Sequence, residues 1–339
     1  MAIETLERIQ IRLDEKRQNL TEFLETASDA EKDTCLCDDE HCIQEHLHVI
    51  ETSLEEIENE TLGLCEICHG FVETSRLEMD YTAHVCLDHY SDEERRRLES
   101  ELELSQIVQR ALLPQRMPNI AGVELAAFSR PSEIIGGDYF DFFNYRDGAH
   151  GLVIADISGH GVSAGMLMSS LQAALRTMAP DTEVPAEILE RINRFYIHNI
   201  NFTTFITIFL ARFDPETRIL SYVNAGHNPP VVHRKQTGEI HWLTRTAPAI
   251  GLAEDFRPKT ASVTLERGDS LLLYTDGLTE ALNLKMEQFG HERLAELFVQ
   301  SVNLTMPDIV QVVRQTVNEF SDRVPLVDDA TLIALKISD

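Results

Sequence analysis

From residue 114 to its end, the chain alternates short apolar runs with longer stretches of helical periodicity. Several of the runs form pairs joined by turn sequences, such as those at 214–217 and 236–238, which is typical of strand hairpins. Hairpins interrupted by helices predict an α+β sandwich rather than a doubly wound parallel sheet. The predicted strands are 152–155, 204–213, 218–224, 231–233, 240–243, 271–274 and 330–335, and the predicted helices are 165–178 and 186–199.

The first 60 residues show the spacing of two amphipathic helices. Apolar side chains recur three and four positions apart in each, as a helix with one buried face requires. An antiparallel helical hairpin is predicted, with Cys35, Cys37 and Cys42 at its tip. Their spacing fits no firm geometry, so a second metal site, an oxidant sensor and plain loop thiols all stay open. The first stripe is Ile3, Leu6, Ile9, Leu13, Leu20 and Leu24, and the second is Ile43, Leu47, Ile50, Leu54 and Ile57.

A further helix is predicted from Ser91 to just before Pro114. Ser91 is a good N-cap, and acidic and then basic side chains follow it. Such a helix either covers part of the next domain or pairs with its copy in a second chain. We favour pairing, and therefore a homodimer, because the apolar stripe resembles a coiled-coil seam. The stripe is Leu98, Leu102, Val108 and Leu112, with Ser105 in register.

Four aspartates stand at the ends of predicted strands or beside glycines. Carboxylates at neighbouring strand ends are how proteins gather oxygen ligands for Mg²⁺ or Mn²⁺. Any one of these segments taken alone is better explained as a turn. Four of them together favour a site for two divalent ions, which would activate water for in-line attack on a phosphate ester without a protein nucleophile. The four are Asp138, Asp156, Asp276 and Asp328.

These segments also carry a family resemblance. From about Leu98 onward the chain resembles the SpoIIE-like branch of the metal-dependent (PPM) serine/threonine protein phosphatases, which implies two antiparallel sheets packed face to face with helices outside. It also implies that the four aspartates bind metal, together with the backbone carbonyl of Ile157. Asp329 adjoins Asp328, and of the two we favour Asp328 as the ligand. The matching motifs are LLP at 112–114, GGDYFD at 136–141, DISGHG at 156–161, NAGHNPP at 224–230, TDG at 275–277 and DDAT at 328–331.

Candidates for an acid or a phosphate contact are fewer. His160 lies in the Gly-His-Gly turn and His227 in the NAGHNPP segment, where either side chain could instead brace a turn. The arginine that clamps phosphate in the eukaryotic relatives is missing from its usual place. Arg130, eight residues before Asp138, is the substitute candidate.

A zinc site is predicted upstream, where Cys65 and Cys68 are followed by Cys86 and His89 in a C-x2-C-x17-C-x2-H spacing. Two such pairs can supply a tetrahedral Cys3His site, and four protein ligands leave no open position for catalysis, so its role would be structural. The alternative is a redox pair with an incidental histidine. This segment resembles the DksA/TraR-type zinc finger, with His89 where that family usually has a cysteine.

Charge narrows the possible partners. The chain of 339 residues carries 57 acidic and 29 basic side chains, for a formal net charge of -28. Nucleic acid and anionic membrane surfaces are therefore disfavoured, and so is an RNA-binding zinc protein. No run is long enough to span a bilayer and the N-terminus does not resemble a signal peptide, which predicts a cytoplasmic protein with reduced cysteines.

Together these patterns predict a metal-dependent phosphatase with a sensory or docking module. Its domains would be a helical hairpin (1–61), a zinc finger (62–90), a linker helix (91–113) and a phosphatase domain (114–339). The family implies a regulatory substrate, a phosphorylated anti-sigma-factor antagonist of the STAS type in a partner-switching pathway. The alternative is a pseudophosphatase or binding module that docks on RNA polymerase or a sigma regulator. Four clustered, mutually repelling carboxylates argue against it, since a scaffold has no need for them.

Overall fold

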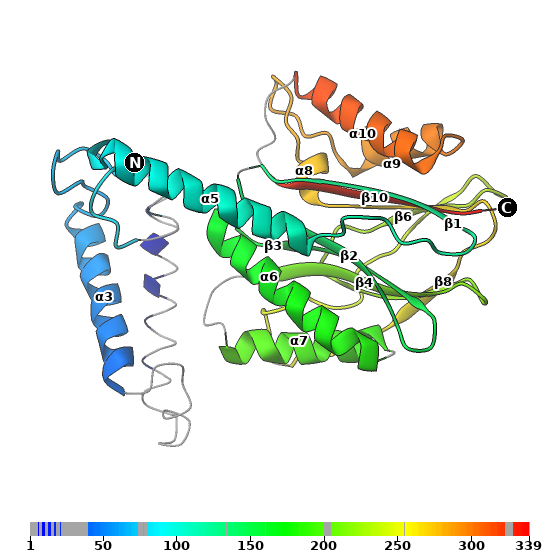
Figure 1. Ribbon diagram of the computed structural model, residues 1–339, viewed down its shortest axis with the longest axis horizontal. Helices are drawn as coiled ribbons and strands as arrows, with labels where there is room; N and C mark the ends of the chain where they lie inside the picture. Colours follow the sequence, from blue (N-terminus) through cyan, green and yellow to red (C-terminus); the bar gives the residue numbers. More distant parts are fainter. Residues whose placement is uncertain are drawn as a thin grey trace. The chain divides into compact units, whose positions relative to one another are not determined.

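A computed structural model gives the fold from residue 40 onward with short gaps, together with isolated positions before it (Figure 1). The chain divides into two compact units, one within Met1–Glu101 and one formed by Leu102–Ile200 and Thr204–Asp339. The described residues are 6, 9, 10, 13, 14, 17, 21, 40–73, 77, 81–132, 134–159, 161–182, 184–199, 205–253, 255–322 and 328–338.

The N-terminal unit has one small core. Helix α3 (Glu40–Glu58) contributes Ile50 and Leu54 to it, and the short helix η1 (Leu87–His89) follows the last of its cysteines. The described positions of the predicted first helix are helical, and Ile9 and Leu13 are buried in the same core. The hairpin and the cysteine-bearing loops therefore fold around shared apolar side chains. The rest of this core is Leu62, Cys65, Val72, Leu77, Ala83 and Cys86.

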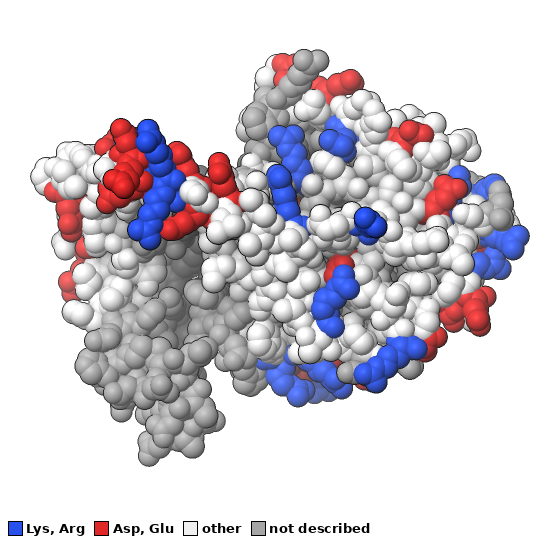
Figure 2. All heavy atoms as spheres, in the orientation of Figure 1, with Lys and Arg blue, Asp and Glu red and all other residues white. Residues whose placement is uncertain are grey.

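Helix α5 (Asp92–Leu112) begins as its sequence predicts. The Glu94 amide donates to Ser91 Oγ at 3.3 Å, and Glu94 Oε2 accepts from the Ser91 amide at 2.9 Å. This reciprocal pair is a capping box, which satisfies two amides at the helix start. Acidic and basic side chains lie together over its first turns, where Arg97 pairs with Glu101 (Figure 2).

The C-terminal unit contains two five-stranded antiparallel sheets, which agrees with the α+β sandwich predicted from the hairpin pattern and with the two sheets that the family resemblance implies. One sheet has the strand order β1-β10-β9-β6-β7 and the other β2-β3-β4-β5-β8. The strands of the first are β1 (Val123–Arg130), β6 (Val231–His233), β7 (Ile240–Trp242), β9 (Ser270–Tyr274) and β10 (Ala330–Ile337). Those of the second are β2 (Tyr139–Asn144), β3 (His150–Ile157), β4 (Ile206–Asp214), β5 (Ile219–Ala225) and β8 (Ala261–Thr264).

Helices cover the outer face of each sheet (Figure 1). Helices α6 (Gly161–Met178) and α7 (Pro185–Asn199) pack on the β2-to-β8 sheet, while α9 (His291–Ser301) and α10 (Met306–Phe320) pack on the other. Two short helices, η2 (Ala179–Asp181) and α8 (Asp276–Thr279), complete the unit. None of the helices among the described residues is long and apolar enough to cross a bilayer.

The layering explains why the central strands read as unbroken apolar runs. In β9, Leu271 and Leu273 face the core between the sheets, whereas Leu272 and Tyr274 face α9 and α10. In β3, Ile154 faces the inner core and Val153 faces α6 and α7. A strand buried on both faces has no polar side to alternate. Polar side chains are therefore expected mainly at the ends of these strands.

Candidate metal centre at the strand ends

The two sheets bring the four predicted aspartates to one end of the sandwich. Asp138 precedes β2 and Asp156 is the second-last residue of β3, and these strands pair with Tyr139 opposite Ala155. Asp276 follows β9 and Asp328 precedes β10, and these strands pair with Leu332 opposite Tyr274. Each antiparallel pair thus places one strand end beside a neighbouring strand start.

A hydroxyl joins the two sheet ends. Thr275 Oγ1 donates to Asp138 Oδ2 at 2.7 Å and accepts from the Thr331 amide at 2.8 Å. The hydroxyl hydrogen of Thr275 has a second acceptor in the Asp329 carbonyl at 3.4 Å, but the Asp138 carboxylate is closer and charged, so it is the favoured acceptor. Thr275 is fully buried, so this contact fixes the carboxylate of Asp138 from the opposite sheet.

The carboxylates raise one another's proton affinity. Burial, followed by the charges of Asp156 and Asp329, raises the pKa of Asp138 well above its usual value. Burial, followed by the charges of Asp276 and Asp328, raises the pKa of Asp156 to about 8. Burial and then Glu280 raise the pKa of Asp276. Such a group holds its negative charge at neutral pH only when cations balance it.

Divalent ions fit this donor set. Asp138 Oδ1 is buried and has no hydrogen-bond partner among the described residues, which leaves one oxygen of a buried carboxylate unused. The carbonyl of Ile157 lies beside Gly137, where a Cβ on the glycine would come within 2.8 Å of it. The Ile157 carbonyl therefore lies next to the segment that carries Asp138. Among the described residues, the aspartate oxygens are not gathered as tightly as the cysteine group described below.

The remaining residues predicted for this centre differ in their exposure and contacts. Asp328 is exposed, whereas Asp329 is 3% exposed and its carboxylate accepts from the Gly137 amide at 2.6 Å. Arg130 is the exposed last residue of β1 and pairs with Ala330 at the same end of the sheet. His160 lies outside the described residues.

His227 braces the backbone near this centre. Its Nδ1 lies 2.9 Å from Thr207 Oγ1, and its amide donates to Asn224 Oδ1 at 2.9 Å. Burial lowers the pKa of His227 to about 3, so the imidazole is neutral. A neutral histidine bonded to a neighbouring hydroxyl is a structural brace rather than an acid, which is the second of the two roles the sequence suggested.

Sequence reasoning missed a buried ion pair in the GGDYFD motif. Asp141 is fully buried and accepts two hydrogen bonds of 2.6 Å from Arg176 on α6. Tyr139 donates to the same carboxylate at 2.8 Å. The pairing ties β2 to the helix that follows the DISGHG motif. The acid of the motif was visible in the sequence, but its partner stands 35 positions away.

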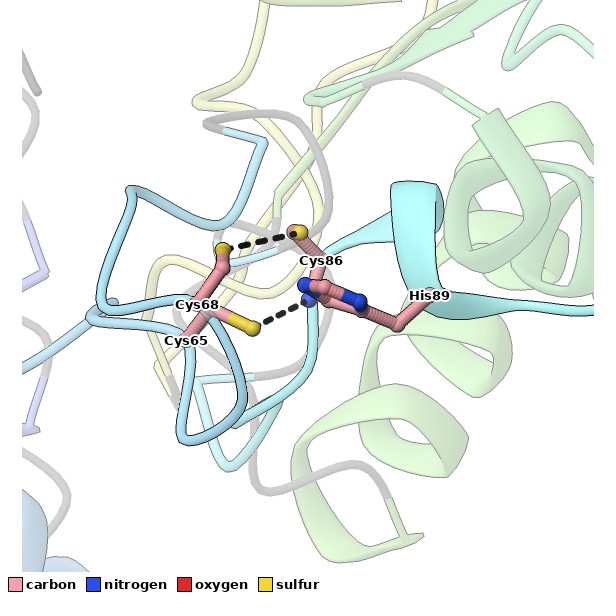
Figure 3. A group of neighbouring side chains, drawn as sticks. All are labelled: Cys65, Cys68, Cys86 and His89. Atoms are coloured by element: carbon pink, nitrogen blue, oxygen red, sulfur yellow. Dashed lines mark hydrogen bonds between the residues drawn. The ribbon is translucent and has the colours of Figure 1, made fainter.

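The predicted cysteine and histidine ligands converge in the N-terminal unit (Figure 3). One ligand atom from each of Cys65, Cys68, Cys86 and His89 lies within 4.8 Å of all the others. Cys68 and Cys86 approach to 3.8 Å between sulfurs, and the Cys86 amide donates to Cys65 Sγ at 3.4 Å. Among the described residues this is the one group of three or more ligand side chains gathered so tightly.

The thiols of this group have opposite acidities. Burial alone would raise the pKa of Cys65, but amide donors led by Cys86 outweigh it and lower the pKa to about 6. Burial, reinforced by the neighbouring thiols, raises the pKa of Cys86 to about 11. One thiolate forms readily and the next is opposed by it, so a cation is needed to hold all three thiolates together. The group therefore fits a soft divalent metal such as zinc.

Comparisons with known proteins match the C-terminal unit. The family model described as stage II sporulation protein E (SpoIIE) matches residues 146–338. Phosphoserine phosphatase RsbU of Bacillus subtilis (strain 168) is 28% identical over 245 residues, which span 71% of this chain and 71% of the relative.

Two solved structures share the fold. The SiaA-PP2C domain of Pseudomonas aeruginosa superposes with a TM-score of 0.63 at 22% identity, over 71% of this chain and 98% of that one. The RsbU and RsbW domains of a Mycobacterium tuberculosis protein give a TM-score of 0.56 at 28% identity, over 65% of this chain and 61% of that one.

Proposed function

The chain belongs to the SpoIIE family, and on that premise we propose that it is a metal-dependent serine/threonine protein phosphatase whose N-terminal unit regulates it. The resemblance and the sandwich fold predicted from the sequence are confirmed. The predicted enzyme class agrees with a relative that is named a phosphoserine phosphatase. The observation that carries the proposal is the buried Asp138 carboxylate, which keeps one unpartnered oxygen beside other acids.

In this proposal the metals are two Mn²⁺ or Mg²⁺ ions held by Asp138, Asp156, Asp276 and Asp328 with the Ile157 carbonyl. When bound, they supply an activated water and positive charge for the phosphoryl oxygens. The protein's own part is to hold the carboxylates at neighbouring strand ends, where the charge of the metals would keep them ionised. Thr275 orients Asp138 from the opposite sheet, and Arg130 stands exposed at the same sheet end, where it would contact the substrate phosphate.

The proposed substrate is a phosphorylated STAS-type anti-sigma-factor antagonist. Two comparisons support a substrate of this regulatory kind. One relative is the phosphatase RsbU, and one solved relative carries RsbU and RsbW domains. The N-terminal unit would then act as the input of a partner-switching pathway, with a structural Zn²⁺ ion in its Cys3His group.

Helix α5 supports the proposed homodimer. Along its length Leu98, Leu104, Ile107 and Val108 are between 41% and 62% exposed. Apolar side chains on successive turns of one helix form the seam that a second helix covers in a coiled coil. Two of the four, Leu98 and Val108, belong to the predicted stripe.

The experiment that tests the substrate class uses a panel of phosphoproteins. A phosphoserine STAS domain, a phosphoserine protein of another fold and a phosphotyrosine protein are each incubated with the full chain and Mn²⁺. The proposal expects phosphate release from the STAS domain well ahead of the others. Equal rates on both phosphoserine proteins would contradict the substrate class, and no release from any would contradict phosphatase activity.

A further inference from the structure

We propose that Asp329 is a positioning residue, which holds the Gly136–Asp138 segment in place so that Asp138 presents its free oxygen to the metals, and that Asp329 is not itself a ligand. This inference rests on the proposed metal-dependent activity. Asp329 adjoins Asp328, which the sequence favours as the metal ligand, and the two aspartates have different surroundings in the structure.

All of the hydrogen-bonding capacity of the Asp329 carboxylate is used within the protein. Oδ1 accepts from the Ser132 amide at 2.7 Å and from Ser132 Oγ at 3.0 Å. Oδ2 accepts from the Gly137 amide at 2.6 Å and from the Asp138 amide at 3.4 Å. A carboxylate offers about four lone-pair sites, and four donors occupy them here. A metal ion would have to displace amides that are themselves buried, which costs free energy for each unpaired group.

Asp328 differs in each of these respects. It is exposed, and its Oδ1 accepts from the amide of Asp329 at 2.8 Å. The two neighbours therefore differ in their surroundings: the Asp329 carboxylate is buried against backbone amides, whereas Asp328 is exposed just before the start of β10.

The glycines around Asp329 show that this close approach is built into the sequence. A Cβ on Gly136 would overlap Asp329 Oδ2, and a Cβ on Gly277 would overlap the Asp329 carbonyl. Two of the three glycines in the GGD and TDG motifs thus make room for the same residue. Through it, β10 is joined to a loop 192 positions earlier in the chain.

The consequence falls on Asp138. Its backbone is held by Asp329, and its Oδ2 is held by Thr275 at 2.7 Å. The remaining oxygen, Oδ1, is buried without a partner in the described part of the chain. Because the backbone amide and one carboxylate oxygen of Asp138 are both held, the other oxygen points in one direction. Groups that orient a metal ligand in this way raise the affinity of the site for its metal.

The test measures Mn²⁺ binding by calorimetry alongside activity on a phosphoserine protein. Asp329→Ala is expected to weaken Mn²⁺ binding by about 10-fold to 100-fold, the usual effect of losing a group that orients a ligand. Saturating Mn²⁺ should restore most of its activity because the ligands remain. Asp329→Asn keeps one acceptor oxygen and should fall between wild type and Asp329→Ala. Asp328→Asn should lose activity that added Mn²⁺ does not restore.

Asp269→Asn is the matched control. Asp269 is 2% exposed and accepts from Arg234 and from the amides of Lys235 and Glu266, but it stands at the opposite end of β9 from Asp276. The Asp269→Asn variant should have a lower melting temperature than wild type and the same Mn²⁺ affinity. Should Asp329→Ala fail to fold, Ser132→Ala, which removes one donor to Oδ1, carries the same expectation in milder form.

Two results would overturn the inference. Wild-type Mn²⁺ affinity in both Asp329→Ala and Ser132→Ala would show that the segment needs no support from Asp329. Loss of activity in Asp329→Ala that Mn²⁺ cannot restore, matching Asp328→Asn, would make Asp329 a ligand. If wild type itself binds no Mn²⁺ and releases no phosphate, the proposed function fails and takes this inference with it.

Discussion

The side chain of Gln109 pairs with the backbone of Gly136 in both directions. Gln109 Nε2 donates to the Gly136 carbonyl at 2.6 Å, and Gln109 Oε1 accepts from the Gly136 amide at 3.1 Å. Gln109 is the buried residue of α5, and Gly136 stands two positions before Asp138. A Cβ on Gly165 would come within 3.0 Å of Gln109 Nε2, so α6 also leaves room for this contact. The linker helix is therefore bonded to the first metal-bearing segment.

Replacing Gln109 should loosen that segment. Gln109→Ala leaves two buried backbone groups of Gly136 unpaired, at a cost of about 1–3 kcal/mol for each. We expect weaker Mn²⁺ binding and lower activity at limiting Mn²⁺, measured by calorimetry and phosphate release. Gln106→Ala, which removes a hydrogen bond to the Ile134 carbonyl one turn earlier, is the control and should have a smaller effect. Equal Mn²⁺ affinity and activity in the two variants would show that the contact between Gln109 and Gly136 does not support the metal site.

Charge placed in the apolar stripe of α5 should separate the proposed dimer. Leu102→Glu puts a carboxylate where a second helix would pack, and an unpaired charge in an apolar seam is costly. We expect a lower mass by light scattering and an altered activity. A fragment starting near Leu113, which lacks the helix, is the comparison. Were wild type, variant and fragment all monomeric and equally active, α5 would be only a tether.

The strands that carry the aspartates were predictable because they are buried on both faces. The runs 152–155, 271–274 and 330–335 lie within β3, β9 and β10, and they are almost wholly apolar because both faces of these strands are covered. The edge strands β1 and β8 are half exposed and gave too weak an alternation to be found. Helices α9 and α10 have ordinary amphipathic periodicity, so their sequences do carry a local helical signal.

The sequence predicts the acids of the candidate site but not the contacts that hold them in place. Motif spacing identifies Asp138 and Asp276, because each motif is local in the sequence. The contact between Thr275 and Asp138 joins residues 137 positions apart, and the contact between Asp329 and Ser132 joins residues 197 apart. One sequence carries no local signal for such pairs. They follow only from the register of two sheets.

The Cys3His group should hold one zinc ion per chain. Cys65 is fully buried in the core of the N-terminal unit, so Cys65→Ser should remove zinc and unfold that unit locally, because metal binding and folding are coupled there. Elemental analysis and proteolysis between 62 and 90 are the measurements. His89→Cys, which keeps four ligands of zinc-binding type, is the control and should retain the metal. Protein purified without chelators that contains no zinc would refute the assignment.

Acid should destabilise the protein in part through His227. Its pKa is lowered to about 3 in the folded chain from an ordinary 6.5, so the unfolded chain binds the extra proton between these values. Stability from this group is complete above pH 6.5 and is lost as pH falls toward 3, at up to about 1.4 kcal/mol per pH unit.

The measurement is urea unfolding of wild type and His227→Gln across that range. The variant lacks the titrating group, so its stability should fall less steeply with acid, and the difference in slopes isolates His227 from the other groups. Parallel slopes would show that the imidazole is not held neutral.

The most direct test of the account is phosphate release from a phosphoserine protein as a function of Mn²⁺, for wild type and Asp276→Asn. Metal charge supplies most of the transition-state stabilisation in such a site, so the variant should lose several orders of magnitude while its circular dichroism is unchanged. Wild type should be inactive after EDTA treatment and recover when Mn²⁺ or Mg²⁺ is restored. Full activity of metal-free wild type, or of Asp276→Asn, would contradict the assignment of the strand-end aspartates as a metal centre.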